Sequence, residues 1–398
     1  MRAALWGTRV KNVDIAIIGG GMVGLSLAAQ LAESRFEIAL VNQGDISRNL
    51  HAVPEARVSA INIASESLLK ACGAWSTLQS QRFRPYTHMQ VWDKDSFGQI
   101  DFSFEETNIA HLGHIIENQN IINALFNSTK HQSNLTMLAN TGITRLELGQ
   151  QAAIMHLNNG ELLSAGLVIG ADGANSLVRK VANLPHTFWS YDQSAIVATV
   201  KTEQQHNNTA RQVFTPLGPL AFLPLADPHH CSIVWSQQTA QATRLMGLTE
   251  VDFNCELSAA LDMRLGLCEL VSQRHCIALT MRYARQWLGQ RCVVIGDAAH
   301  TIHPLAGQGA NLGFQDAQSL ATALMSQSPE QLGDMQLLRG FERERKAEAA
   351  KMVATMEGFK QLFDGAHPLK KLARASGLAI FNRIPPIKHK LIQHAMGL

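Results

Sequence analysis

The sequence lacks any grouping of metal-binding residues at a recognisable spacing. Its six cysteines are scattered along the chain, and none of them forms a Cys-x-x-Cys pair. Structural zinc sites and disulfide frameworks usually show such spacings. We therefore predict no metal centre, and we interpret the cysteines as reduced thiols that mostly fill the core, as expected of a cytoplasmic protein.

The chain also lacks an excess of charge of one sign. It has 34 lysine and arginine residues against 32 aspartate and glutamate residues. This near balance gives no basis for nucleic-acid binding, which usually needs a basic face. With 398 residues, 46% of them hydrophobic and 17% charged, the chain is long enough for two domains and apolar enough for a large core.

No convincing membrane span or secretion signal is present. Residues 13–32 are largely apolar and long enough to cross a bilayer, but Asp14 and the run Gly19–Gly21 interrupt them. Residues 1–12 lack an apolar core region and a cleavage site. A strand, a tight turn and a helix explain the apolar stretch better.

That turn carries a glycine pattern typical of dinucleotide binding. Residues 13–18 are β-rich, and Gly19-x-Gly21-x-x-Gly24 then opens a Leu/Ala-rich helix. Gly19 would allow a tight turn, Gly21 would let a pyrophosphate approach the helix N-terminus, and Gly24 would allow close helix–strand packing. A second strand over residues 37–41 completes a βαβ unit.

The acidic partner of this pattern is missing. An Asp or Glu about 20 residues on usually binds a ribose hydroxyl, but the second strand ends at Asn42. An amide oxygen can still accept that hydrogen bond, although it carries no charge. The alternative is that Asn42 is only a turn residue.

Two further strands end in Asp-containing turns. Asp172-Gly173 follows an apolar strand and precedes a short helix, so Asp172 either faces a ligand or only caps that helix. Gly296-Asp297 follows another strand, and Asp297 could accept a ribityl hydroxyl. Beyond them, Gly307, Gly309 and Asn311 would begin a helix whose free N–H groups can face a flavin. His300 and His303 are candidate acid–base groups.

The rest of the pattern mixes strands and helices. We predict helices over residues 55–72, 117–130, 249–264, 311–326 and 335–363, strands over 141–148, 152–157, 162–169 and 291–295, a hairpin over 91–104 and a β-rich segment over 189–235. The last helix would carry an exposed Glu342–Lys346 ion pair.

These segments predict an α/β fold with three parts. We expect a discontinuous Rossmann-like FAD-binding domain over residues 13–75, 110–185 and 285–330, an inserted β-sheet substrate domain over 76–109 and 186–284, and a C-terminal helical region over 331–398.

Taken together, the motifs resemble a known family. Gly19-x-Gly21-x-x-Gly24, Gly170–Gly173 and Gly296–His300 are similar to those of flavin-dependent aromatic hydroxylases with the p-hydroxybenzoate hydroxylase fold. The resemblance spans residues 13–398, and Asn42, where the family has Glu, is its main departure. The runs 57–62, 91–98 and 296–316 narrow the resemblance to the ubiquinone-biosynthesis hydroxylases, and 91–98 points to their bacterial 2-polyprenylphenol hydroxylase branch.

The resemblance implies a site and a reaction. FAD would lie extended, with Arg57 and Asn118 touching it and Pro304 beside its ring system. NAD(P)H would reduce FAD, O2 would form a C4a-hydroperoxide, and a polyprenylated phenol would be hydroxylated. The predicted cofactor-binding residues are Gly19, Gly21, Gly24, Asn42, Arg57, Asn118, Asp172, Asp297, Gly307, Gly309 and Asn311, with His303 and Pro304 as candidates lining the flavin.

The segment after Asp364 contains basic and apolar residues but no Asp or Glu. Such a mixture is typical of contact with a membrane surface, here the inner membrane, or with a quinone-biosynthesis complex. The alternative is a helix packed on its own domain with solvated charges. Pro385-Pro386 would break any single long helix.

Two other functions stay open at the level of sequence. The chain could be a non-catalytic assembly subunit that keeps the flavin fold, or an FAD dehydrogenase without oxygen chemistry. A homo-oligomer is also compatible with the sequence.

Overall fold

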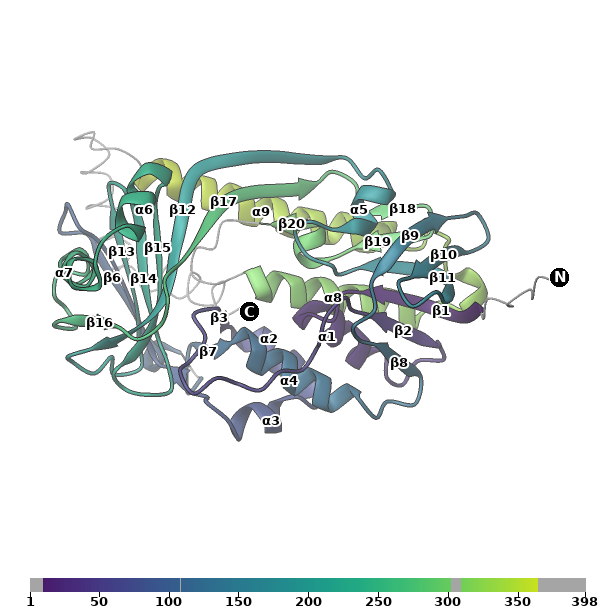
Figure 1. The fold of residues 1–398 in the computed structure, drawn as a ribbon, viewed down its shortest axis with the longest axis horizontal. Coiled ribbons are helices and arrows are strands. Elements are labelled where there is room, and N and C mark those ends of the chain that lie inside the picture. Colours follow the sequence, from purple (N-terminus) through teal and green to yellow (C-terminus); the bar gives the residue numbers. More distant parts are fainter. Residues whose placement is uncertain (1–9, 108, 302–308, 364–398) are drawn as a thin grey trace, which may run out of the picture.

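A five-stranded parallel sheet forms the centre of one half of the molecule in the computed structural model, which describes residues 10–107, 109–301 and 309–363 (Figure 1). Its order is β19-β11-β1-β2-β8, with all four pairings parallel. The strands are β1 (Val10–Ile18), β2 (Ile38–Val41), β8 (Leu135–Leu138), β11 (Leu162–Gly170) and β19 (Cys292–Val294). Strand β18 (Leu288–Gly289) and the meander β9 (Ile143–Leu148) and β10 (Ala153–Leu157) extend it in antiparallel fashion.

Helices cover this sheet and bury its apolar strands. Helix α1 (Met22–Gln30) packs between α4 (Asn118–Thr129) and α8 (Gly309–Met325). Ile15 of β1, Leu25 of α1 and Phe314 of α8 are completely buried in one core. A parallel strand buried on both faces reads as a continuous apolar run, and together with the buried helix α1 it explains why residues 13–32 are apolar over a length that could cross a bilayer.

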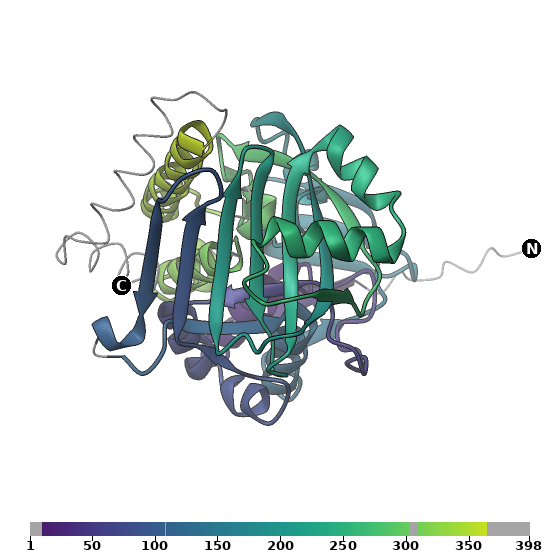
Figure 2. The ribbon, with the colours of Figure 1, turned by 90° about the vertical axis from the view of Figure 1, so that its left-hand side faces the viewer.

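The other half of the molecule is built on a nine-stranded, mostly antiparallel sheet of order β20-β17-β12-β15-β14-β13-β5-β6, with β16 paired to β12. Helices α6 (Thr239–Met246) and α7 (Glu250–Ala260) cover its outer face (Figure 2). The strands are β5 (His88–Asp93), β6 (Gln99–Ser103), β12 (His186–Thr202), β13 (Thr209–Thr215), β14 (Gly218–Pro224), β15 (His230–Gln238), β16 (Cys268–Leu270), β17 (His275–Ala284) and β20 (His300–Thr301).

A small antiparallel sheet lies between the two halves. It has the order β3-β7-β4, formed by Val58–Ile61, Gly113–Glu117 and Pro85–Tyr86, and is flanked by α2 (Ile63–Ala71) and α3 (Trp75–Gln79). Ala60 and Ile115 of this sheet pack against Ala221 and Leu223 of the large sheet. The small sheet therefore connects the two cores.

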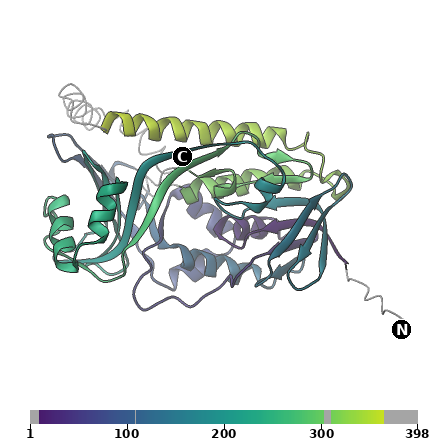
Figure 3. The same ribbon diagram turned by 45° about the horizontal axis from the view of Figure 1, so that its top comes forward.

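The long helix α9 (Arg339–Phe363) runs beside the extended strands β12 and β17 and packs on α8 (Figure 3). Tyr283 of β17 donates a hydrogen bond from its hydroxyl to the carbonyl of Lys346 in α9. Short helices complete the described chain: α5 (Leu177–Val181) and the 3-10 turns η1 (Phe104–Glu106), η2 (Gly296–Ala298) and η4 (Pro329–Gln331).

The structure confirms the predicted α/β class, the opening βαβ unit, the hairpin and the β-rich segment. The helix predicted over residues 55–72 is wrong in its first part, because Val58–Ile61 pairs with β7 as strand β3. Asn62 then begins α2 by accepting a hydrogen bond from the Ser65 N–H. The helix predicted over 249–264 stops at Ala260, and Asp262 and Met263 follow in left-handed backbone conformations.

Four of the six cysteines are buried, whereas Cys255 and Cys276 are exposed. Among the described residues, no helix is both long enough and apolar enough to cross a membrane. His303, Pro304, Gly307 and the basic tail after residue 363 lie outside the described residues.

Candidate cofactor site

The glycine turn after β1 has the geometry that the sequence predicts. Gly19 has φ +112°, a left-handed conformation that favours glycine. A Cβ on Gly19 would lie 2.3 Å from the carbonyl oxygen of Ala171, and the Ala171 N–H donates to the Ile18 carbonyl at 2.8 Å. The turn after β1 and the turn after β11 therefore touch, although about 150 residues separate them.

Gly21 and Gly24 differ in what surrounds them. Gly21 is the N-cap of α1 and has no capping side chain, and, apart from its chain neighbours, no atom of the described residues lies within 4 Å of the position that a Cβ would take. A Cβ on Gly24 would lie only 2.0 Å from the Gly19 carbonyl oxygen. The open space at Gly21 adjoins a helix N-terminus with free N–H groups, which suits a phosphate.

The third motif meets the same helix. Gly296 has φ +59°, and a Cβ on it would lie 3.1 Å from Cγ2 of Val23 in α1. A Cβ on Gly313 of α8 would lie 2.6 Å from the same methyl group. The three strand-end turns thus converge around the N-terminus of α1.

Asp297 is exposed to solvent, yet protein atoms surround it closely. This desolvation raises the pKa of its carboxyl group, while His300 and Arg57 oppose the rise. Arg57 is exposed and lies near enough to Asp297 for its positive charge to lower the pKa of that carboxyl group.

A buried charge cluster, which the sequence did not reveal, holds the Gly296 turn. Asp316 of α8 is fully buried, and its carboxylate accepts hydrogen bonds from the Gly296 N–H at 3.0 Å and from Nε of Arg345 at 2.8 Å. Nε2 of His300 also bonds to it. Burial alone would raise the pKa of Asp316, but His300 and Arg345 hold it below its ordinary value. His300 is therefore buried, and its contact with Asp316 helps to hold the Gly296 turn in position.

Asn42 makes two local contacts. Its side-chain oxygen accepts from the Gly20 N–H at 2.9 Å, and its amide donates to the Gly44 carbonyl at 2.7 Å. The side chain thus ties the glycine turn to the loop after β2. These contacts are typical of a turn residue, the alternative that the sequence left open. They hold the side-chain oxygen of Asn42 beside the glycine turn.

Asp172 caps a helix, which is one of the two roles that the sequence left open. Its Oδ2 accepts from the N–H groups of Leu177 and Val178 at 2.6 and 3.3 Å and so caps α5. Its Oδ1 is buried and has no hydrogen-bond partner among the residues that the structure describes. A buried carboxylate oxygen without a partner is costly, so this atom is free to accept a hydrogen bond from a ligand.

Asn118 and Asn311 both support strand β3. Asn118 accepts a hydrogen bond from the Ser59 hydroxyl at 2.7 Å. Asn311 is buried, donates to the Ala60 carbonyl at 2.7 Å and accepts from the Asn62 N–H at 3.2 Å. Gly309 begins α8, and a Cβ on it would lie more than 4 Å from the described residues outside its own helix backbone.

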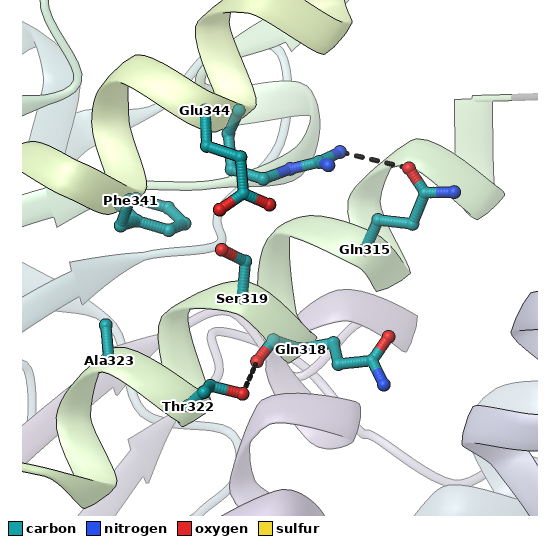
Figure 4. Close-up of a pocket in the computed structure, with 8 residues that line it drawn as sticks. Gln315, Gln318, Ser319, Thr322, Ala323, Phe341 and Glu344 are labelled. Atoms are coloured by element: carbon teal, nitrogen blue, oxygen red, sulfur yellow. Dashed lines mark hydrogen bonds between the residues drawn. The ribbon is translucent and has the colours of Figure 1, made fainter.

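A separate depression lies between α8 and α9, and the side chains that line it are mostly polar (Figure 4). Arg345 donates to the side-chain oxygen of Gln315 at 3.2 Å across it. None of the predicted cofactor residues lines this depression, so we do not assign the flavin to it. Its lining residues are Gln315, Gln318, Ser319, Thr322, Ala323, Phe341, Glu344 and Arg345.

The comparisons with known proteins agree with this geometry. Residues 12–356 match a family described as an FAD binding domain. The chain is 33% identical to the 3-demethoxyubiquinol 3-hydroxylase of Escherichia coli, over 98% of this chain and 99% of the relative. It is 32% identical to the ubiquinone hydroxylase UbiL of Rhodospirillum rubrum (98% and 91% covered) and 32% identical to the human ubiquinone biosynthesis monooxygenase COQ6 (96% and 92%).

Solved structures share the fold at lower identity. The p-nitrophenol 4-monooxygenase PnpA of Pseudomonas putida has a TM-score of 0.79 at 14% identity, covering 97% of this chain and 98% of that one. PqsL of P. aeruginosa, in complex with 2-aminobenzoylacetate, has a TM-score of 0.78 at 20% identity, covering 93% and 100%. Both the family match and the long relatives show that the chain belongs to the FAD-dependent hydroxylases that include the ubiquinone-biosynthesis enzymes.

Proposed function

We propose that this protein hydroxylates the ring of a polyprenylated phenol during ubiquinone biosynthesis. In the overall reaction, the ring C–H becomes C–OH, NAD(P)H and a proton supply the reducing power, and the second oxygen atom of O2 leaves as water. The observation that carries the proposal is the convergence of three turns on α1 in a chain whose full-length relatives are ubiquinone-biosynthesis hydroxylases.

The predicted residues fit an extended FAD. The open N-terminus of α1 at Gly21 would hold the pyrophosphate, and Asp297 would accept from the ribityl chain. The partnerless Oδ1 of Asp172 is a further acceptor at the same convergence. Bound FAD supplies the redox and oxygen chemistry, while the protein binds, orients and excludes water.

Other predicted residues would complete the cofactor contacts. Arg57 lies close enough to Asp297 to affect its titration, so we place it over the phosphate or ring portion of FAD. We propose, on the basis of the sequence, that Asn42 lies beside the ribose of FAD and that Asn118 also contacts the cofactor. His303, Pro304 and Gly307 remain candidates beside the flavin ring on the basis of the sequence.

The inner face of the nine-stranded sheet provides an apolar surface for the substrate. Val91, Ile100 and Phe214 form one buried cluster there, with Met89 and Phe102 packed against it. Aromatic rings and prenyl chains bind by burying apolar area, at about 25 cal/mol per Å². We therefore propose that the phenol ring lies between this face and the flavin.

The decisive experiment supplies purified, FAD-loaded protein with NAD(P)H, labelled O2 and a short-chain prenylphenol. We expect consumption of NAD(P)H and one labelled oxygen atom in the hydroxylated product. Reduction of FAD by the phenol itself, without NAD(P)H, would instead identify a dehydrogenase. A protein that cannot be reconstituted with FAD would support the assembly subunit.

We also propose that the basic, apolar segment at residues 364–398 docks the protein on the inner membrane or on a partner complex. A polyprenylated substrate resides in the bilayer, so docking would shorten its path to the site. Vesicles containing anionic lipid should retain the full chain. Replacing Lys370, Lys371 and Arg374 with Glu should weaken that retention, with each basic residue contributing about 1 kcal/mol. Equal retention of both proteins would contradict this part of the proposal.

A further inference from the structure

Three metal-ligating side chains meet at the small sheet, away from the converging turns. Glu66 lies on α2, His111 precedes β7, and His114 lies on β7. Nε2 of His111 is 2.7 Å from Oε2 of Glu66, and Nδ1 of His114 is 3.3 Å from the same oxygen. One ligand atom from each residue lies within 4.8 Å of the other two.

His114 supplies an independent indication that a ligand belongs here. Its side chain is 3% exposed, and its Nδ1 is buried without a hydrogen-bond partner within residues 10–107, 109–301 and 309–363, because the contact with Glu66 lacks hydrogen-bond geometry. The ring is held in place by stacking on Phe83 and by an edge contact with Trp75. A buried, fixed nitrogen with no partner is costly unless it binds something.

We propose that Glu66, His111 and His114 bind a divalent ion of the zinc class. Two imidazoles and one carboxylate are ligands that Zn²⁺ uses, and three protein ligands leave a fourth position for water. Zn–N distances of about 2.0 Å place neighbouring ligand atoms about 3.3 Å apart in a tetrahedron. Oε2 of Glu66 lies 3.3 Å from Nδ1 of His114, which matches that value, and 2.7 Å from Nε2 of His111, so a small rotation of His111 would complete the site.

One oxygen of the Glu66 carboxylate faces both histidines. Nζ of Lys70 binds the other carboxylate oxygen of Glu66 at 2.7 Å and leaves Oε2 directed at the histidines. Lys70 is itself 53% exposed and can move away from an incoming ion.

The ion would join helix α2, strand β7 and the residues just before β7, close to the nine-stranded sheet. Leu112 lies between the two histidines in the sequence and packs with Ile63, Tyr86 and Phe104 in an apolar cluster. Binding would therefore fasten α2 to β7 and brace this cluster. None of the three ligands is among the predicted FAD residues, so the metal site can fail while the proposed hydroxylation stands.

The test uses full-length, FAD-loaded protein after removal of metals with a chelator. Titration with Zn²⁺ should show one ion per chain by calorimetry and elemental analysis, whereas Mg²⁺ should not bind. His111→Ala should weaken Zn²⁺ binding at least about tenfold. His156→Ala is the matched control, because His156 pairs with Glu147 on the surface at 3.5 Å and should leave binding unchanged.

A measurement on the unaltered protein keeps the test decisive if a variant fails to retain flavin. His111 is 19% exposed, so diethyl pyrocarbonate should modify it, and bound Zn²⁺ should block that modification. The proposal is overturned by the absence of saturable Zn²⁺ uptake, by equal affinity in His111→Ala, or by Zn²⁺ that leaves His111 as reactive as before.

Discussion

Two glycines of the turn after β1 differ in the space around them. A side chain at Gly21 would enter empty space at the start of α1, whereas a side chain at Gly24 would collide with the Gly19 carbonyl oxygen. Substitutions three positions apart should therefore have different effects, one on the proposed FAD binding and the other on packing.

We expect Gly21→Val to fold but to lose FAD. The valine side chain would occupy the space of the pyrophosphate, and we expect affinity to fall at least about tenfold, equivalent to 1.4 kcal/mol. Flavin absorbance after reconstitution measures the loss, and circular dichroism checks the fold. Gly24→Ala, by contrast, should destabilise the protein by about 1–3 kcal/mol through overpacking. Full flavin occupancy in Gly21→Val would refute the placement of the pyrophosphate.

Asp297→Ala should weaken FAD binding without unfolding the protein. Its carboxylate is exposed, and a charge-assisted hydrogen bond contributes about 1.5–3 kcal/mol. Titration of the apoprotein with FAD should show a loss of about tenfold or more. Glu250→Ala, at the exposed start of α7, is the control and should bind FAD normally. An unchanged affinity in Asp297→Ala would argue against a ribityl contact.

At the scale of elements, Asp316 fastens the Gly296 turn, β20 and α9 to α8. Asp316→Asn should destabilise the protein by about 3–5 kcal/mol, because it leaves Arg345 and its neighbours as a buried, uncompensated group. Denaturant unfolding measures the change. The control is Glu256→Gln, which breaks an exposed pair with Arg244 and should have little effect. Similar losses in both variants would contradict a special role for the buried cluster.

The same carboxylate predicts a pH dependence. Its pKa is lowered in the folded protein, so the unfolded chain binds a proton first as the pH falls. The stability it contributes is complete above the ordinary pKa of Asp, about 3.9, and is lost as the pH drops through the lowered value. Unfolding midpoints measured from pH 7 downwards should fall below about pH 4. Asp316→Asn should show a smaller fall in that window, and an identical acid limb in both proteins would contradict the assignment.

Elements that contact distant segments were predicted least well. Residues 58–61 read as helix because Val58 and Ile61 have helical spacing, but pairing with β7 makes them a strand. The expected Glu342–Lys346 pair is replaced by contacts in which Glu342 accepts from the Trp287 N–H and Lys346 donates to the Arg285 carbonyl. Local spacing contains no information about a partner segment 55 to 61 residues away.

At the scale of the whole molecule, FAD would contact turns that belong to three separate stretches of the chain. Its binding should therefore stabilise the entire first half of the molecule, by about 2.7 kcal/mol when free FAD is 100 times its dissociation constant. Calorimetry should show a melting temperature that rises with FAD concentration. Over the same range of FAD concentration, Gly21→Val should show a clearly smaller rise in melting temperature. A flavin-bound protein whose melting temperature ignores free FAD would contradict the proposed bridging.

The sequence by itself determined the opening βαβ unit, the glycine turn and the family, because these depend on short-range periodicity and on motifs read over a few residues. Only the tertiary structure decided that Gly19 touches Ala171, that Asp316 binds Arg345, and that Glu66 meets His111 and His114. The partners in those contacts are 29 to 152 positions apart in the sequence. The contact of Glu66 with the two histidines also depends on the pairing of β7 with β3. Burial and proximity of this kind arise from packing whole elements together, which no local pattern records.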